Sequence, residues 1–244
     1  MPDRPSPAST PEIIAHRGAS RQRRENTLAA FDRALELGAD AIELDVHATA
    51  DELVVVHHDP ALGADAGALA GRTIASLRAA EVQGGDVAAE TRIPSLAEVL
   101  SLVDGRATVY VEIKGAGIEA QVVETIARSP RRGARCAVHS FDHRAARRAR
   151  ELSGRAPGGE VPTGILLVSR PVDPAAVMRA AGARDLWQHW ELLDADLVSE
   201  VHAGGGRVVA WTVNEPAVAR RFASMGVDGI CTDVPDLMRE ALER

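Results

Sequence analysis

Aromatic residues, cysteine and long apolar runs are scarce in this chain of 244 residues. Only 3% of the residues are aromatic, and the two cysteines, Cys136 and Cys231, lie far apart within apolar, strand-like runs. This placement predicts buried free thiols and argues against both a disulfide framework and a cysteine-based metal site. No apolar run approaches the roughly twenty residues that a membrane-spanning helix needs. Hydrophobic residues nevertheless make up 45% of the chain, which excludes a disordered polypeptide.

An excess of positive charge is also lacking, since the formal net charge is −7. This balance argues against a general affinity for nucleic acid or for anionic lipid, so we expect no nucleic-acid partner and no stable membrane anchoring. The stretch from Arg131 to Arg150 is a local exception. Four of its arginines recur at helical spacing and predict a solvated helix face: Arg144, Arg147, Arg148 and Arg150.

Lysine is nearly absent, because only one of the 28 basic residues, Lys114, is a lysine. Ammonium and guanidinium differ in size, hydration and pKa. We therefore expect Lys114 to occupy a position where the planar fork of an arginine would not serve.

The first residues are polar and rich in proline, without the apolar core of a signal peptide. We expect residues 1–11 to form a disordered lead-in and residues 12–244 to form a single domain. The absence of a secretion signal predicts a cytoplasmic location.

Short β-like runs alternate with helical segments along the whole chain. Helical periodicity marks Thr27–Leu37 and Ser95–Val103, the second opened by a capping-box pattern. This alternation predicts an α/β fold, a (β/α)8 TIM barrel. A doubly wound sheet is the alternative, but the glycine-rich dinucleotide loop expected after its first strand is missing. The eight predicted strands are Glu12–His16, Ala41–His47, Thr108–Lys114, Arg135–Ser140, Thr163–Val168, Asp185–His189, Arg207–Val213 and Gly229–Thr232.

One irregular stretch interrupts this rhythm, from Asp59 to about Arg92. It is rich in glycine and alanine, and Ala75–Ala80 is its best candidate for a helix. We expect residues 59–92 to be a short insertion at the barrel rim, after the second strand.

Polar side chains gather at the ends of several predicted strands. The carboxyl ends of barrel strands meet on one face, and alternation places Glu43 with Asp45, and Glu112 with Lys114, on the same side of their strands. Three inward carboxylates are costly to bury unless they are paired or bind a cation. Oxygen ligands suit Mg²⁺ or Ca²⁺, so we expect one of these divalent cations.

Two histidines accompany these carboxylates. His16 ends the first strand, and His58 follows the apolar run Leu53–Val56. Imidazole titrates near neutral pH and can act as an acid or a base, whereas Arg17 and Lys114 suit an anionic substrate. Since neighbouring side chains alternate between faces, only one of His57 and His58 is expected to enter the site. The remaining histidines are interpreted as structural: His47, His57, His139, His143, His189 and His202.

An ordered set of motifs resembles the glycerophosphodiester phosphodiesterase family, and it covers nearly the whole chain after the first dozen residues. The matching stretches are HRGAS (16–20), ENTLAAFDRALELGADAIELDV (25–46), HDP (58–60), IPSLAEVL (93–100), VEIK (111–114), HSFD (139–142), VVAWTVN (208–214) and GVDGICTDVP (226–235).

This resemblance implies a TIM barrel that hydrolyses glycerophosphodiesters to an alcohol and sn-glycerol 3-phosphate with a bound divalent cation. It implies a role for each matching polar residue in the motifs. The metal ligands would be Glu43, Asp45 and Glu112; the acid/base pair would be His16 and His58; Arg17 and Lys114 would contact the phosphate, Trp211 would flank the glycerol, and Glu25 and Asn26 would support the first loop.

The segment after His58 departs from the family pattern, because Ala61–Asp65 replaces a Leu-Asp-Arg-Thr-like stretch. The identity of the alcohol, the acid or base role of each histidine and the oligomeric state therefore stay open. A lysophospholipase D-like or other phosphodiesterase on the same barrel is the main alternative. A Schiff-base aldolase using Lys114 is disfavoured, since nearby carboxylates stabilise its ammonium form. A non-catalytic barrel is disfavoured because none of the expected site residues is lost.

Overall fold

The computed structural model describes residues 10–84, 92–129, 135–156 and 159–243. The expected lead-in lies almost entirely outside these ranges. Within them, no helix is both long enough and apolar enough to span a bilayer.

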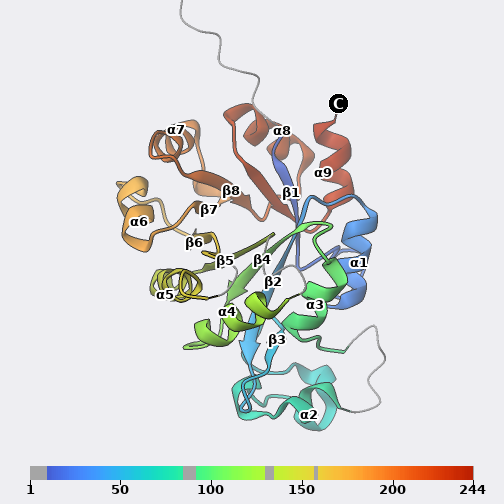
Figure 1. Cartoon of the computed structure of the whole chain (residues 1–244). Coiled ribbons are helices and arrows are strands. Elements are labelled where there is room, and N and C mark those ends of the chain that lie inside the picture. Colours follow the sequence, from blue (N-terminus) through green and yellow to red (C-terminus); the bar gives the residue numbers. More distant parts are fainter. Residues whose placement is uncertain (1–9, 85–91, 130–134, 157–158, 244) are drawn as a thin grey trace, which may run out of the picture.

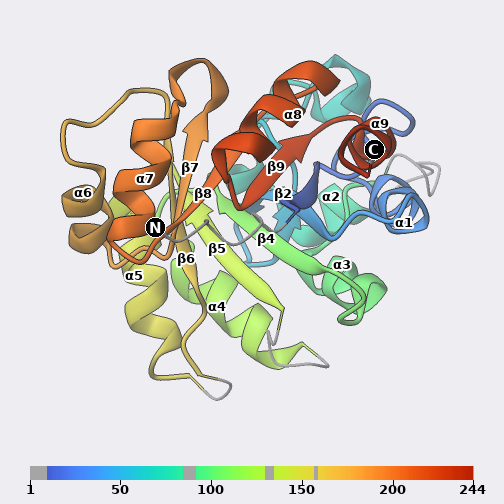
Figure 2. The same cartoon turned by 90° about the horizontal axis from the view of Figure 1, so that it is seen from above.

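Eight parallel strands close into a barrel, as the sequence predicts (Figures 1 and 2). Neighbouring strands pair in parallel around the sheet, and the pairing of the first strand with both the second and the last closes the ring. The predicted strand positions are confirmed to within a residue or two. The strands are β1 (Glu12–His16), β2 (Ala41–Ala48), β4 (Thr108–Ile113), β5 (Cys136–Ser140), β6 (Thr163–Leu167), β7 (Asp185–His189), β8 (Arg207–Trp211) and β9 (Gly229–Thr232).

Helices surround the barrel and shield the outward faces of its strands (Figure 1). Side-chain caps fix several helix starts: the Thr27 hydroxyl accepts from the Ala30 amide, and Ser95 and Glu98 form the predicted capping box. The surrounding helices are α1 (Leu28–Glu36), α3 (Leu96–Val103), α4 (Glu119–Arg128), α5 (His143–Ser153), α6 (Pro174–Ala181), α7 (Ala195–Ala203), α8 (Pro216–Met225) and α9 (Pro235–Leu242).

The insertion differs from the prediction in two respects. The apolar run after β2 forms a short strand, β3 (Val54–Val56), antiparallel to the end of β2. The expected helix at Ala75–Ala80 is wrong, because a 3-10 turn (Ile74–Ser76) ends there and α2 (Ala79–Gln83) begins only after it. The extended backbone of Leu77 separates the two and directs Ile74 and Leu77 into a small separate core. This unit lies outside the ring of helices (Figure 1), and the rest of the predicted insertion, residues 85–91, lies outside the described residues.

The barrel interior has a packed floor and a polar upper end. Tyr110 and Trp187 fill the lower interior together with smaller apolar residues. Below them, Glu12 accepts hydrogen bonds from the Tyr110 hydroxyl (2.7 Å) and from Arg207 (3.1 Å), which closes the amino-terminal end. Among the described residues, the polar end of the barrel interior is therefore the one at the carboxyl ends of the strands.

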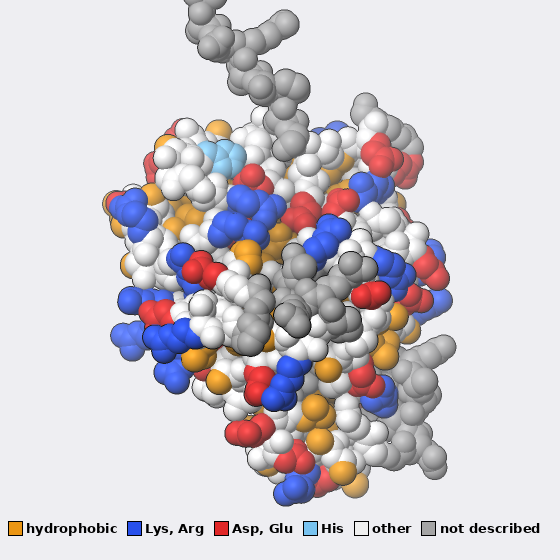
Figure 3. All heavy atoms as spheres, in the orientation of Figure 1, with side chains coloured by type: hydrophobic (Ala, Val, Ile, Leu, Met, Phe, Trp, Pro, Cys, Tyr) orange, Lys and Arg blue, Asp and Glu red, His pale blue; other side chains and the backbone are white. Residues whose placement is uncertain are grey.

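Of two predictions about single residue types, one is confirmed and the other is confirmed in part. Cys136 and Cys231 are both buried free thiols. On α5, Arg144, Arg147 and Arg148 are exposed while the alanines of the opposite face are buried, as expected for a solvated face. The fourth predicted arginine, Arg150, is instead half-buried, because its guanidinium donates to Glu160 Oε1 at 2.7 Å and to the Gly182 carbonyl oxygen. Basic and acidic side chains are interspersed over the face of the molecule in Figure 3, which fits the absence of a strongly basic surface there.

Candidate active site

A pocket of about 170 Å³ opens at the carboxyl ends of the barrel strands, which is where TIM-barrel enzymes place their sites. It brings together residues from all eight barrel strands and from the loops that follow them. Its lining residues are His16, Arg17, Glu43, His58, Glu112, Lys114, His139, Phe141, Leu166, Trp187, Trp211 and Cys231.

The turn after β1 positions the first two of these residues. Arg17 and Gly18 both adopt positive φ values, +57° and +84°. A Cβ on Gly18 would lie 2.6 Å from the carbonyl carbon of Ala30, so only glycine fits between this turn and α1. The turn directs the Arg17 amide to Glu43 Oε2 at 3.2 Å. The glycine of the HRGAS stretch (16–20) is thus required by the close approach of this turn to the backbone of α1.

His16 is oriented by Asp233, which follows β9. Its Nδ1 donates to Asp233 Oδ1 at 2.7 Å, and Asn214 donates to the other carboxylate oxygen at 2.7 Å. Burial by itself lowers the pKa of His16, but the Asp233 hydrogen bond and the charge of Glu43 outweigh it and raise the pKa above its ordinary value. This imidazole therefore holds its proton to higher pH than a free histidine.

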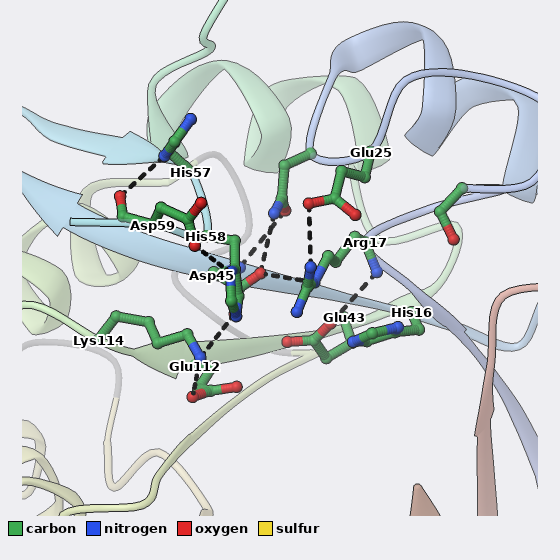
Figure 4. Close-up of polar contacts among 12 residues, drawn as sticks. His16, Arg17, Glu25, Glu43, Asp45, His57, His58, Asp59, Glu112 and Lys114 are labelled. Carbon is green, nitrogen blue, oxygen red and sulfur yellow. Dashed lines mark hydrogen bonds and ion pairs between the residues drawn. The ribbon is translucent and has the colours of Figure 1, made fainter. Parts of the chain in front are cut away.

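Asp45 is buried between two cations (Figure 4). Its Oδ2 lies 3.1 Å from Arg17 Nε and accepts a 2.9 Å hydrogen bond from Asn26, and its Oδ1 lies 3.6 Å from Lys114 Nζ. Burial favours the neutral acid, but these partners prevail and hold the pKa of Asp45 below its usual range. Glu25 pairs with Arg17 at 2.9 Å and so supports the same arginine.

Glu112 has the opposite electrostatic character. It is 6% exposed and lies 3.1 Å from Lys114, yet burial, with further contributions from the charges of Asp45 and Glu43, raises its pKa to about 7. Three buried carboxylates, those of Glu43, Asp45 and Glu112, therefore lie close together in the pocket beside Arg17 and Lys114.

His58 and His57 diverge, as strand alternation predicts. His58 lines the pocket, and its Nδ1 donates to Asp59 Oδ1 at 2.7 Å. His57 points away from the carboxylates in Figure 4 and donates to the Asp59 carbonyl oxygen at 2.9 Å. It lines a separate cavity under the insertion, with Leu62 and Leu69.

Aromatic side chains form one wall of the pocket mouth. Trp211 packs edge-to-face on Phe141, with ring centroids 5.4 Å apart, and on His189 at 5.3 Å. Lys114 Nζ lies 5.6 Å from the centre of the Phe141 ring. Trp211 therefore lies beside the pocket as the sequence prediction requires, whereas Phe141 was not anticipated.

Two further polar residues of the site were missed from the sequence. Asp233 lies in the matching stretch 226–235, but no local pattern ties it to His16, because the contact spans 217 positions. His139 was interpreted as structural, yet it lies beside Glu112 in the β4–β5 register and faces the pocket. The same alternation that selected Glu112 could have selected His139, since it lies one residue before the end of the next strand of the barrel.

The site can accommodate a divalent cation. Glu43, Glu112 and His139 each offer one donor atom, and these three atoms lie within 4.8 Å of one another. Both ring nitrogens of His139 are buried with no hydrogen-bond partner among the described residues, so they are available as ligands. Asp45 lies outside this cluster and is paired with Arg17 and Lys114 instead.

A closed (β/α)8 barrel with acidic and imidazole groups at the carboxyl ends of its strands defines the class, an enzyme of the TIM-barrel type. The sequence profile of the glycerophosphoryl diester phosphodiesterase family matches residues 16–237. The chain belongs to this family and is a phosphoric diester hydrolase.

Individual relatives support this assignment. The chain is 33% identical to a glycerophosphodiester phosphodiesterase of Caldanaerobacter subterraneus subsp. tengcongensis, over 93% of this chain and 95% of the relative. It is 34% identical to a probable glycerophosphodiester phosphodiesterase of Mycobacterium tuberculosis, over 94% and 89% of the two chains. Among solved structures, an Oleispira antarctica phosphodiesterase in complex with the product sn-glycerol-3-phosphate superposes with a TM-score of 0.84 at 25% identity, covering 96% of this chain and 98% of that one.

Proposed function

We propose that this enzyme hydrolyses glycerophosphodiesters to an alcohol and sn-glycerol 3-phosphate, with a bound divalent cation and an acid/base pair of histidines. The observation that carries the proposal is the meeting of His16, His58, Arg17 and Lys114 with buried carboxylates in one pocket. The family match and the product named for the Oleispira antarctica neighbour support the same substrate class.

The cation would be held by Glu43, Asp45 and Glu112. Bound there, it would supply positive charge to the non-bridging phosphate oxygens and offset the repulsion among the carboxylates. A set of carboxylates alone suits Mg²⁺ or Ca²⁺. Because Asp45 is already flanked by two cations, its part would be to hold Arg17 and Lys114 in place as well as to complete the ligand set.

Arg17 and Lys114 would contact the phosphodiester from the two sides of Asp45. Both retain hydrogen-bond donors beyond those used in their ion pairs, and both line the pocket. Glu25 and Asn26 would hold this arrangement, since Glu25 pairs with Arg17 and Asn26 donates to Asp45. Trp211 would flank the glycerol, with Phe141 beside it.

The two histidines would divide proton transfer between them. His58 would accept a proton from the water that attacks phosphorus, while the bond from phosphorus to the alcohol oxygen breaks. His16 would donate its proton to that oxygen, because Asp233 keeps it protonated to higher pH. The oxygen of the water remains on the phosphate of sn-glycerol 3-phosphate, so atoms and protons balance.

A lysophospholipase D-like reaction on the same site is a second candidate. Apolar side chains are exposed on the loops that follow β5, β6 and β7, at the end where the pocket opens: Phe141, Val168, Val172 and Leu192. A mouth of this kind suits an acyl chain on the glycerol.

A cytoplasmic location and the absence of a nucleic-acid partner stay predictions of the sequence.

The test is a comparison of glycerophosphocholine, glycerophosphoethanolamine, glycerophosphoglycerol and lysophosphatidylcholine as substrates. We expect release of sn-glycerol 3-phosphate from the first three, and its loss in Glu43→Gln. Faster turnover of lysophosphatidylcholine, reduced in Val172→Asp, would favour the second candidate. No phosphodiester cleavage by folded, metal-loaded enzyme would refute both.

A further inference from the structure

We infer that His139 is a nitrogen ligand of the cation site, and that the site therefore selects divalent transition-metal ions such as Mn²⁺ and Co²⁺ over Ca²⁺. The inference rests on the proposed function in one respect, namely that a divalent cation binds in this pocket. It assigns a donor and an ion class that the sequence motifs do not provide, because they indicate oxygen ligands alone.

The first observation is that the buried His139 imidazole makes no hydrogen bond with the described residues. The residue is 1% exposed, and neither Nδ1 nor Nε2 has a hydrogen-bond partner among the described residues. Buried polar side-chain atoms are nearly always hydrogen-bonded, and an unmade hydrogen bond costs about 1–3 kcal/mol. A polar ring with two unused nitrogens at the edge of an active-site pocket therefore requires an explanation.

The second observation is the direction in which the ring is held. His139 packs against Trp187, with ring centroids 4.2 Å apart, and stacks with Tyr110 at 6.2 Å. These large side chains form the floor of the barrel interior and hold the imidazole against the wall that carries the carboxylates. Its Nε2 lies 3.7 Å from Glu43 Oε1. This separation is too long for a hydrogen bond but falls within the roughly 3–4 Å that separates two ligands of one ion, each about 2.1 Å from it.

The third observation is strand register. Asp45, Glu112 and His139 are direct partners across β2, β4 and β5, so their side chains form one row inside the barrel. Asp45, at one end of this row, lies within 3.6 Å of two cations. The donor atoms that converge are instead those of Glu43, Glu112 and His139. His139 thus places a nitrogen donor beside the carboxylates of Glu43 and Glu112, at the end of the row away from these two cations.

One nitrogen donor changes which ions bind best. Ca²⁺ takes oxygen ligands almost exclusively, whereas imidazole suits first-row transition metals, whose affinities rise from Mn²⁺ towards Cu²⁺. Carboxylates joined by one imidazole still leave room for water and phosphate oxygens. We therefore expect Mn²⁺ and Co²⁺ to bind at least tenfold more tightly than Ca²⁺.

The decisive experiment is pulsed electron paramagnetic resonance on protein stripped with a chelator and reloaded with one equivalent of Mn²⁺. A directly bound imidazole nitrogen modulates the electron spin echo, and labelling histidine with ¹⁵N changes the modulation frequency. We expect this modulation in the wild type, its loss in His139→Gln, and no change in His202→Gln, where the replaced histidine lies on α7 away from the pocket.

Binding isotherms provide the second readout. In His139→Gln the preference for Mn²⁺ over Ca²⁺ should fall at least tenfold, while Ca²⁺ affinity changes little. If His139→Gln does not fold, His16→Gln and His58→Gln decide the assignment, because His16, His58 and His139 are the three histidines of the pocket lining. Modulation that persists in both variants assigns the nitrogen to His139.

The inference is overturned if wild-type protein binds Mn²⁺ stoichiometrically without nitrogen modulation, or if the modulation survives in folded His139→Gln. Hydrolysis that depends on a metal, without nitrogen coupling, would leave the proposed function intact and remove His139 from the ligands. Nitrogen coupling without any hydrolysis would leave His139 among the ligands and remove the proposed function.

Discussion

The hydrogen bond between His16 and Asp233 controls the protonation of His16 in the pocket. Because Asp233 raises the pKa of His16, a reaction that needs protonated His16 loses rate only when the pH rises through that elevated value. Asp233→Asn removes the negative partner, so we expect the alkaline limb of the pH profile of kcat/KM to move to lower pH. The control is Asp228→Asn, which alters a similar Asp–His pair, with His202, remote from the pocket. An unchanged alkaline limb in Asp233→Asn would contradict the role of His16 as the proton donor.

Glu112 should make the metal-free protein lose stability as the pH rises. Its pKa is raised from 4.5 to about 7, so between these values the folded state binds more protons than the unfolded state. The stability that the folded protein gains from binding this proton is fully present below about pH 4.5 and disappears as the pH rises through about 7. The free energy of unfolding, measured with denaturant in the presence of a chelator, should therefore fall with a clear slope between pH 4.5 and about 7 in the wild type. In Glu112→Gln the slope should be weaker. Identical slopes in the two proteins would refute the assignment.

His58 and His57 offer a matched pair for testing acid–base catalysis. His58→Ala should retain metal binding and lose roughly two to four orders of magnitude in kcat, the usual range for a positioned acid or base. His57→Ala alters the neighbouring residue, whose ring points away from the carboxylates (Figure 4), and should cost less than about tenfold. Similar losses in both variants would mean that the segment, and not the His58 imidazole, matters.

Strands and helices of this chain were predictable where a single periodicity governs them. The barrel strands were found because apolar and polar positions alternate and turn residues separate them. The insertion was less predictable, since its short core, with Ile74 and Leu77, is too small to impose a period. Asp233 was missed for a different reason: its role depends on a contact with His16 across the barrel, which no local pattern encodes. His139 was within reach of the alternation that selected Glu112, but its place beside Glu112 depends on the register between the two strands.

The turn between β1 and α1 is the element on which the arginine of the site depends. Gly18→Ala adds a positive-φ penalty of about 1–2 kcal/mol and a clash, because its Cβ would lie 2.6 Å from backbone atoms of Ala30. Gly205→Ala is the matched control, with a φ of +77° and no atom within 4 Å of the added Cβ. Urea unfolding should show a clearly larger loss of stability for Gly18→Ala, accompanied by a rise in KM as Arg17 shifts. Equal losses would show that the close approach to α1 is unimportant.

At the scale of the whole molecule, the two ends of the barrel serve different purposes. The amino-terminal end is closed by hydrogen bonds of Tyr110 and Arg207 to Glu12, and Arg207 also pairs with Asp185 at 3.4 Å. The carboxyl end keeps buried carboxylates and imidazoles that are incompletely paired. A barrel can sustain such an unfavourable cluster because the extensive apolar layer between strands and helices stabilises the fold independently of it.

The most direct test of the account is the release of sn-glycerol 3-phosphate from glycerophosphocholine by purified protein, with and without a chelator. We expect release that stops when the metal is removed, returns when a divalent cation is restored, and is lost in Glu43→Gln under both conditions. Release that is equally fast in the presence of the chelator and in Glu43→Gln would contradict the account.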